Sequence, residues 1–137
     1  MSGTAVIFHN MSHLSAALAV AAETGKQITL LTPVGGAGYA DPGYYQRLLE
    51  RAVSANPGVR CRCLLDCGAD AALALQALRD GWMEIVFAGP AETREKIESA
   101  AGSMAPRVLA AAPAAIDLMA SADIDAACRQ ALTGDQV

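Results

Sequence analysis

Short apolar runs alternate with helical patterns along the whole chain of 137 residues, and no other feature constrains the fold as strongly. Segments with helical spacing of apolar residues follow the runs. The runs cover residues 4–9, 27–32, 59–66, 83–88 and 107–112. Strands that alternate with helices favour a parallel sheet with helices on both faces. We therefore predict one three-layer α/β/α domain over residues 1–137, with a five-stranded parallel sheet.

Helix-capping residues support this division of the chain. Asn10 or Ser12 can cap the first helix, and Gly25 can end it. The Asp41-Pro42 pair is typical of the start of another helix. Residues 114–120 are ambiguous between strand and helix. Crossovers between parallel strands are right-handed, which leaves few topologies, and we predict the flavodoxin-like strand order 2-1-3-4-5.

The composition excludes several classes of protein. Hydrophobic residues make up 53% of the chain and charged residues only 18%, so we expect some surface to be buried in a homo-oligomer. The net charge of −4 and the lack of a basic stripe predict no binding of nucleic acid. No segment is typical of a signal peptide or a membrane span, so we predict a cytoplasmic protein with no membrane partner and with reduced cysteines.

A binding cleft is predicted where the strand order reverses, between the carboxyl ends of the runs at 4–9 and 59–66. The candidate residues there are His9, Asn10, Ser12, His13, Asp66, Cys67, Gly68 and Asp70. Helix N-termini and histidines donate hydrogen bonds to anions, so we expect a small anionic ligand as a partner. The alternative is that Ser12 and Asp70 only cap their helices.

The glycine-rich stretch after the second run is a further candidate for ligand binding. In "PVGGAGYADPG", Gly35 and Gly36 permit close backbone approach, and Tyr39 can supply a stacking face or a lid. The stretch lacks the lysine and hydroxyl of a P-loop. The alternative is a plain connector with packed tyrosines.

The cysteines divide into two kinds. Cys61 and Cys63 are two residues apart on one strand, so they share a face and are expected in the core. Their spacing to Cys67 is not a zinc-site spacing, and we predict no metal and no cofactor. Cys67 lies before a helix start, where a thiolate is favoured, and His13 or His9 could act as its base. The alternative is an inert, half-buried cysteine.

Two resemblances bear on these residues. The topology and the "LLD" that ends at Asp66 resemble a response-regulator receiver domain, in which such an aspartate accepts a phosphoryl group. The chain departs from receivers at His9-Asn10, Ala88-Gly89 and Ala112-Pro113, which implies at most a degenerate, receiver-like interaction module. Cys67 and the chain length are also similar to sulfur-carrier domains of the DsrE type, which are oligomeric α/β units with a reactive cysteine.

Three functional hypotheses follow from the sequence. The leading one is a cytoplasmic domain that binds a small molecule or an anion at the predicted cleft. The second is a thiol-dependent enzyme of the sulfur-transfer or acyl-transfer type that uses Cys67. The third is a receiver-like interaction module, and the fold alone does not choose among them.

Overall fold

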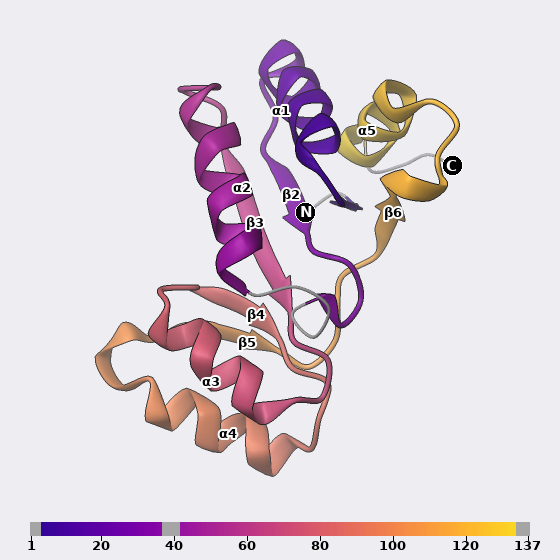
Figure 1. Cartoon of the computed structure of the whole chain (residues 1–137). Helices are drawn as coiled ribbons and strands as arrows, with labels where there is room; N and C mark the ends of the chain where they lie inside the picture. Colours follow the sequence, from indigo (N-terminus) through magenta and orange to yellow (C-terminus); the bar gives the residue numbers. More distant parts are fainter. Residues whose placement is uncertain (1–3, 37–41, 134–137) are drawn as a thin grey trace.

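The computed structural model describes residues 4–36 and 42–133. It is an α/β protein in which a parallel sheet is flanked by helices (Figure 1). The strands are β1 (Ala5–Ile7), β2 (Ile28–Leu31), β3 (Cys61–Asp66), β4 (Glu84–Val86), β5 (Arg107–Leu109) and β6 (Ala115–Asp117). The α-helices are α1 (Met11–Thr24), α2 (Pro42–Ser54), α3 (Ala71–Arg79), α4 (Ala91–Ala100) and α5 (Ile124–Thr133). Among the described residues there are also the short 3-10 helices η2 (Gly102–Met104) and η3 (Leu118–Ala120).

The strands follow the order β5-β4-β3-β2-β1-β6 across the sheet. The predicted α/β class and the parallel sheet with flanking helices are confirmed, but the five strands and the order 2-1-3-4-5 are wrong. The sixth strand comes from the ambiguous residues 114–120, and it pairs with β1 through Ala5 and Ala115. Because β2 lies on the other side of β1, the chain order reverses between β1 and β6, not between β1 and β3.

Strand β3 joins two parts of the sheet. Its residues from Cys61 to Leu64 pair with β2, whereas Leu65 and Asp66 pair with β4. In Figure 1, β4 and β5 lie with α3 and α4, while β1, β2 and β6 lie with α1, α2 and α5. The strands β4 and β5 run at a wide angle to the first part of β3. The sheet is therefore strongly twisted, and any site in this protein is built on it.

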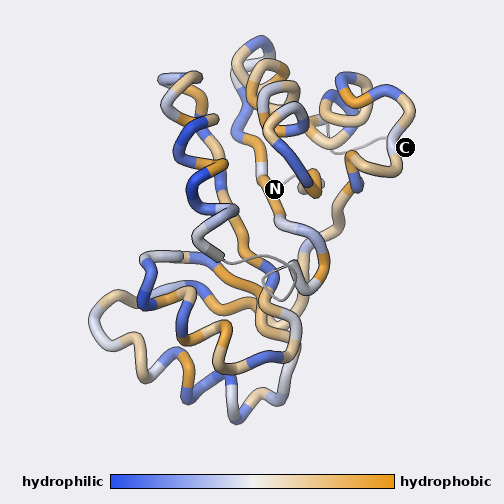
Figure 2. The backbone as a smooth tube through the Cα atoms, in the orientation of Figure 1, coloured by the Kyte–Doolittle hydropathy of each residue, from blue (hydrophilic) through white to orange (hydrophobic). Residues whose placement is uncertain are grey.

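The buried side chains form two clusters that differ in the elements that contribute to them. The larger one joins hydrophobic side chains from α1 to α5 with strand residues such as Val6, Leu30 and Ile85. The smaller one contains strand residues alone: Ala5, Leu31, Leu64 and Val86 are buried, and Ile7, Leu109 and Ala115 are partly buried against them. Hydrophilic residues gather on outward turns of α2 (Figure 2). The layers are therefore packed asymmetrically, and the helices share one core.

Charged side chains on three neighbouring strands explain this asymmetry. Arg62 of β3 donates from Nε to Oε1 of Glu84 on β4 at 2.6 Å, and Arg107 of β5 lies 3.5 Å from the same oxygen. These residues alternate with the apolar residues of the larger cluster, so they lie on the opposite face of the sheet. A helix packed over them would have to bury three charges, which is costly.

Local helix signals match the sequence closely. The Asn10 side chain caps α1 by accepting from the His13 backbone N–H at 2.9 Å, and Gly25 ends the helix with φ 70°. Ser12 is exposed within the first turn and is not the cap. Among the described residues, no helix is long and apolar enough to cross a membrane.

Candidate functional site

The carboxyl edge of the sheet holds a cluster of three ionisable side chains at β1 and β6. His9 Nε2 lies 2.7 Å from Asp117 Oδ1, and the His9 backbone N–H donates to His13 Nδ1 at 3.0 Å. Asp117 Oδ1 also accepts from the Met119 backbone N–H at 2.9 Å. The two histidine rings meet edge to face, 5.7 Å apart. The structure thus brings the two predicted histidines together and adds Asp117, which the sequence reasoning missed.

The hydrogen bond to His13 fixes which of its ring nitrogens carries the proton. Because Nδ1 accepts a backbone N–H, the neutral ring carries its proton on Nε2. Burial lowers the pKa of His13, the neighbouring His9 lowers it further, and Asp117 acts in the opposite direction. His13 is therefore held in its neutral form and binds a proton only weakly near neutral pH.

The other predicted residues of this edge gather at β2 and β3. Asp66 is buried, and its Oδ1 accepts from the Gly68 backbone N–H at 2.8 Å. The Asp66 backbone N–H donates to the Thr32 hydroxyl at 2.8 Å. Gly68 has φ 59°, and a Cβ added to it would lie 3.8 Å from the Gly35 Cα. These bonds tie the β2–α2 loop to the end of β3, and each has a clear structural role.

Cys67 lies in this tied-down turn. It is 2% exposed, and its Sγ has a weak contact with the Leu65 carbonyl oxygen at 4.0 Å. Burial and the charges of Asp66 and Asp70 raise the pKa of Cys67 to about 12. Within the described chain, no hydrogen bond joins Cys67 to His9 or His13. This environment opposes the thiolate that nucleophilic chemistry at Cys67 needs.

The remaining predicted residues do not gather at one place in the fold. Asp70 caps α3 by accepting from the backbone N–H groups of Ala72 and Leu73 at 3.0 and 3.1 Å. Gly36 packs closely, because a Cβ there would lie 3.2 Å from the Tyr45 hydroxyl oxygen. Tyr39 lies outside the described residues. No group of three metal-ligating His, Cys, Asp or Glu side chains is found in residues 4–36 and 42–133.

A pocket of about 520 Å³ lies at the opposite end of the sheet, between α2 and the amino ends of β3 and β4. We call it the α2–β3 pocket. It is lined by Gln46, Leu49, Glu50, Val53, Ser54, Cys61, Arg62, Cys63, Gly81, Trp82, Met83 and Glu84. Its volume falls within the range of small-molecule sites. The sequence reasoning placed Cys61 and Cys63 in the core and did not foresee a cavity beside them.

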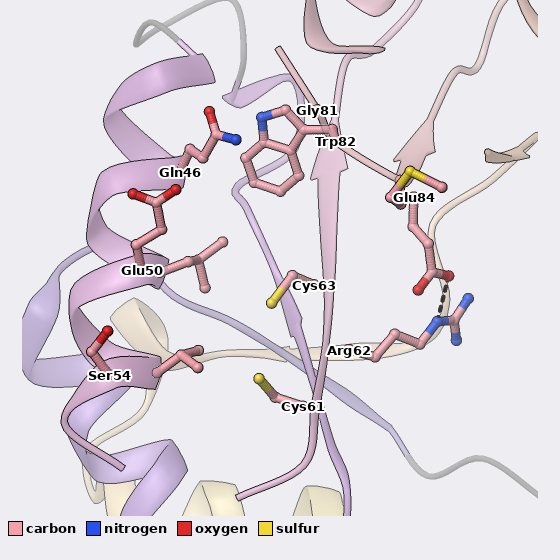
Figure 3. A pocket seen from close by; sticks show the side chains of 12 residues that line it. Gln46, Glu50, Ser54, Cys61, Arg62, Cys63, Gly81, Trp82 and Glu84 are labelled. Carbon is pink, nitrogen blue, oxygen red and sulfur yellow. Dashed lines mark hydrogen bonds and ion pairs between the residues drawn. The ribbon is translucent and has the colours of Figure 1, made fainter. Parts of the chain in front are cut away.

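The indole of Trp82 forms part of the wall of this pocket, near Gln46 (Figure 3). The side chain is only 6% exposed. Its Nε1 is buried and has no hydrogen-bond partner among the described residues. A buried donor without a partner costs about 1–3 kcal/mol of stability. Because this atom is buried, the indole offers the pocket its apolar ring surface and not its donor.

The two cysteines of the pocket shift each other's pKa in opposite directions. Their sulfur atoms point to the same side of β3, toward α2, whereas Arg62 points away from α2 to Glu84 (Figure 3). A hydrogen bond from Cys63 lowers the pKa of Cys61 to about 7. The same bond, burial and the charges of Cys61 and Glu84 raise the pKa of Cys63. The thiolate of the pair is therefore favoured on Cys61 over Cys63.

Two sequence signals point toward this pocket in retrospect. The chain has a single tryptophan, and it directly follows Gly81 at the start of a strand. The Cys61-Arg62-Cys63 alternation puts two thiols on one face and a cation on the other. Neither signal predicts a cavity, because the distance between α2 and β3 depends on packing between segments that lie far apart in the sequence.

Neither protein-family models nor curated proteins match the chain. What the site does therefore has to follow from its own side chains. The α2–β3 pocket combines apolar walls with two thiols and the polar side chains of Gln46 and Glu50. The carboxyl edge combines two histidines and an aspartate whose hydrogen bonds are mostly satisfied within the chain.

Proposed function

We propose that the protein is a small-molecule-binding α/β domain and that the α2–β3 pocket is its binding site. The observation that carries the proposal is a pocket of about 520 Å³ whose wall combines apolar side chains with Gln46 and Glu50. Binding sites for small molecules are mostly apolar concavities with a few polar groups that fix orientation.

The lining residues define the chemistry of the ligand. Leu49, Val53 and the indole of Trp82 offer apolar contact, whereas Gln46 and Glu50 are polar groups on the α2 side. The Arg62 guanidinium is engaged by Glu84 on the other face of the sheet. An apolar, neutral or cationic ligand therefore suits this pocket better than an anion.

Fluorescence of Trp82 provides the test, since it is the only tryptophan in the chain. We expect a fragment library of neutral and cationic aromatic compounds to contain members that shift the emission of Trp82 and raise the melting temperature. The Ser54→Phe variant should block binding, because Ser54 is an exposed residue of the pocket wall. Ser15→Phe, on the exposed face of α1, is the matched control. Binding that survives Ser54→Phe unchanged would contradict the proposal.

A second candidate site keeps the predicted anionic ligand at the carboxyl edge. The observation that favours it is the reversal of chain order between β1 and β6, where His9 and Asp117 meet. Ligands of open α/β sheets bind at such a reversal. Titration of labelled protein with acetate and phosphate, followed by the His9 ring signals in NMR, tests this site. Unchanged signals at millimolar anion would remove it.

The other hypotheses remain predictions with their own tests. Sulfur or acyl transfer at Cys67 would require its thiol to react in the folded protein, although burial opposes this. A receiver-like role would require Asp66 to react with a phosphoryl donor such as acetyl phosphate. The homo-oligomer is tested by sedimentation velocity, and the cytoplasmic location by fractionation of cells that express the tagged protein.

A further inference from the structure

We propose that Cys61 is a covalent attachment site within the α2–β3 pocket, where it exchanges with low-molecular-weight disulfides and retains one half of the reagent. This inference rests on the proposed function, because the pocket must first admit a small molecule. Its carrying observation is the pair of thiols on one face of β3 that both line the cavity.

The arrangement of the pair singles out Cys61. Cys61 is the first residue of β3, both thiols line the pocket, and the pKa of Cys61 is lowered to about 7 while that of Cys63 is raised. Both cysteines are partly buried, whereas Cys67 and Cys128 are buried at 2% and 0% exposure. A thiolate that is stabilised by a neighbouring donor and reachable from solvent is the reactive kind.

The step is an ordinary thiol–disulfide exchange. The Cys61 thiolate attacks one sulfur of the reagent, a new S–S bond forms, and the old S–S bond breaks. The leaving sulfur departs as a thiolate with the electron pair of that bond and takes a proton from water. The reagent disulfide is the oxidant, so no further redox partner is needed.

The strand geometry keeps Cys63 from displacing the attached group. Residues two apart on a strand are separated by about 6.5 Å, and their Cβ atoms point the same way. A disulfide requires Cβ atoms about 3.5–4.5 Å apart, so bridging Cys61 and Cys63 would distort β3. The mixed disulfide should therefore persist until an external thiol removes it.

The charge of the pocket selects among reagents. Glu50 lies on the α2 side of the pocket, and the described part of the chain shows no ion pair for it. The neighbouring Glu84 is already bound by Arg62 and Arg107. The pocket should therefore favour a cationic disulfide over an anionic one of similar size.

The experiment compares cystamine with 3,3′-dithiodipropionic acid on the native protein at pH 7, with peptide mass spectrometry as the readout. We expect one adduct, on Cys61, that forms at least about tenfold faster than any adduct on Cys67. Cystamine should react about threefold faster than the diacid. Glu50→Gln should abolish this preference, while Glu98→Gln, on the exposed face of α4, should leave it intact.

Variants make the outcome decisive. Cys61→Ser and Cys61→Ala should lose the adduct and keep the wild-type melting temperature within a few degrees. Cys63→Ser should still form the adduct but more slowly. An intramolecular Cys61–Cys63 disulfide, or equal labelling of all cysteines, would overturn the inference. Ligand binding by Cys61→Ser, followed through Trp82 fluorescence, tests the proposed function separately, so each of the two can fail without the other.

Discussion

The two edges of the sheet differ in how their polar groups are satisfied. At the carboxyl edge, His9 bonds to Asp117, Asp66 bonds to the Gly68 backbone, and Asp70 caps α3. At the amino edge, the Trp82 indole has no partner within the described chain, and the Cys61 and Cys63 thiols line the α2–β3 pocket. The polar residues that are most conspicuous in the sequence are thus the ones already engaged in the fold.

This difference teaches how to weigh candidate site residues. A side chain that completes a turn or a helix end contributes stability whether or not a ligand binds. The side chains that line the α2–β3 pocket, such as Glu50, can contact a ligand without giving up a helix cap or a turn. We therefore give the amino edge the greater weight for function and the carboxyl edge the greater weight for stability.

The rate of cysteine alkylation should show the largest difference between the two edges of the sheet. At pH 7, we expect iodoacetamide to alkylate Cys61 about 100-fold faster than Cys67, because the pKa of Cys61 lies near 7 and that of Cys67 near 12. The Cys61 rate should rise with pH through a midpoint near 7. Peptide mass spectrometry from pH 5 to 9 measures both rates. Fast labelling of Cys67 in the folded protein would reverse our assignment of the two edges.

Removal of the Asp66 carboxylate should be the largest change at the carboxyl edge. We expect Asp66→Ala to lower the free energy of unfolding by about 2 kcal/mol, because the Gly68 backbone N–H loses a charged acceptor. Asp66→Asn keeps an acceptor in place and should lose less. Urea denaturation followed by circular dichroism measures both variants. Wild-type stability in Asp66→Ala would show that this bond is not structural.

The cap of α3 should have a smaller effect. Asp70→Ala should lower the free energy of unfolding by about 1 kcal/mol, because two backbone N–H groups of the first turn lose their acceptor. Asp80→Ala, at the other end of the same helix, is the matched control and should be neutral or slightly stabilising. Equal destabilisation by the two changes would argue against a specific cap.

The smallest effect concerns the pH dependence of stability at His13. Burial lowers the pKa of His13 below its ordinary value of 6.5, so the unfolded chain binds its proton more readily than the folded one. Stability should therefore fall as the pH drops through 6.5 toward the lower pKa of the folded state. His13→Asn keeps an acceptor near the position of Nδ1 and should flatten this slope. Melting temperatures between pH 5 and 8 measure it, and a slope unchanged in His13→Asn would assign the effect to other groups.

Local signals made the helices and strands predictable. Asn10, Gly25 and Asp70 mark helix ends through bonds to their own neighbours, so their roles can be inferred without the rest of the chain. The strand order was mispredicted because pairing joins residues far apart in sequence, such as Ala5 and Ala115. The alternating charges of Arg62, Glu84 and Arg107 were the one sequence signal against helices on that face.

The candidate site was predictable only in part. His9 and His13 were expected near each other and do lie together, because four residues separate them at the start of one helix. Asp117 was missed, since β6 reaches β1 only after the chain crosses back over the whole sheet. The α2–β3 pocket was missed because a cavity is a property of packing between elements and not of any one segment.

The sequence by itself determined the α/β class, the helix ends and the shared face of Cys61 and Cys63, because these depend on periodicity and on bonds between near neighbours. The tertiary structure decided which strands pair, which histidine meets which carboxylate, and whether a cysteine is open to a pocket or sealed in a turn. Those outcomes depend on contacts between distant segments, whose free energies are settled only when the whole core has packed.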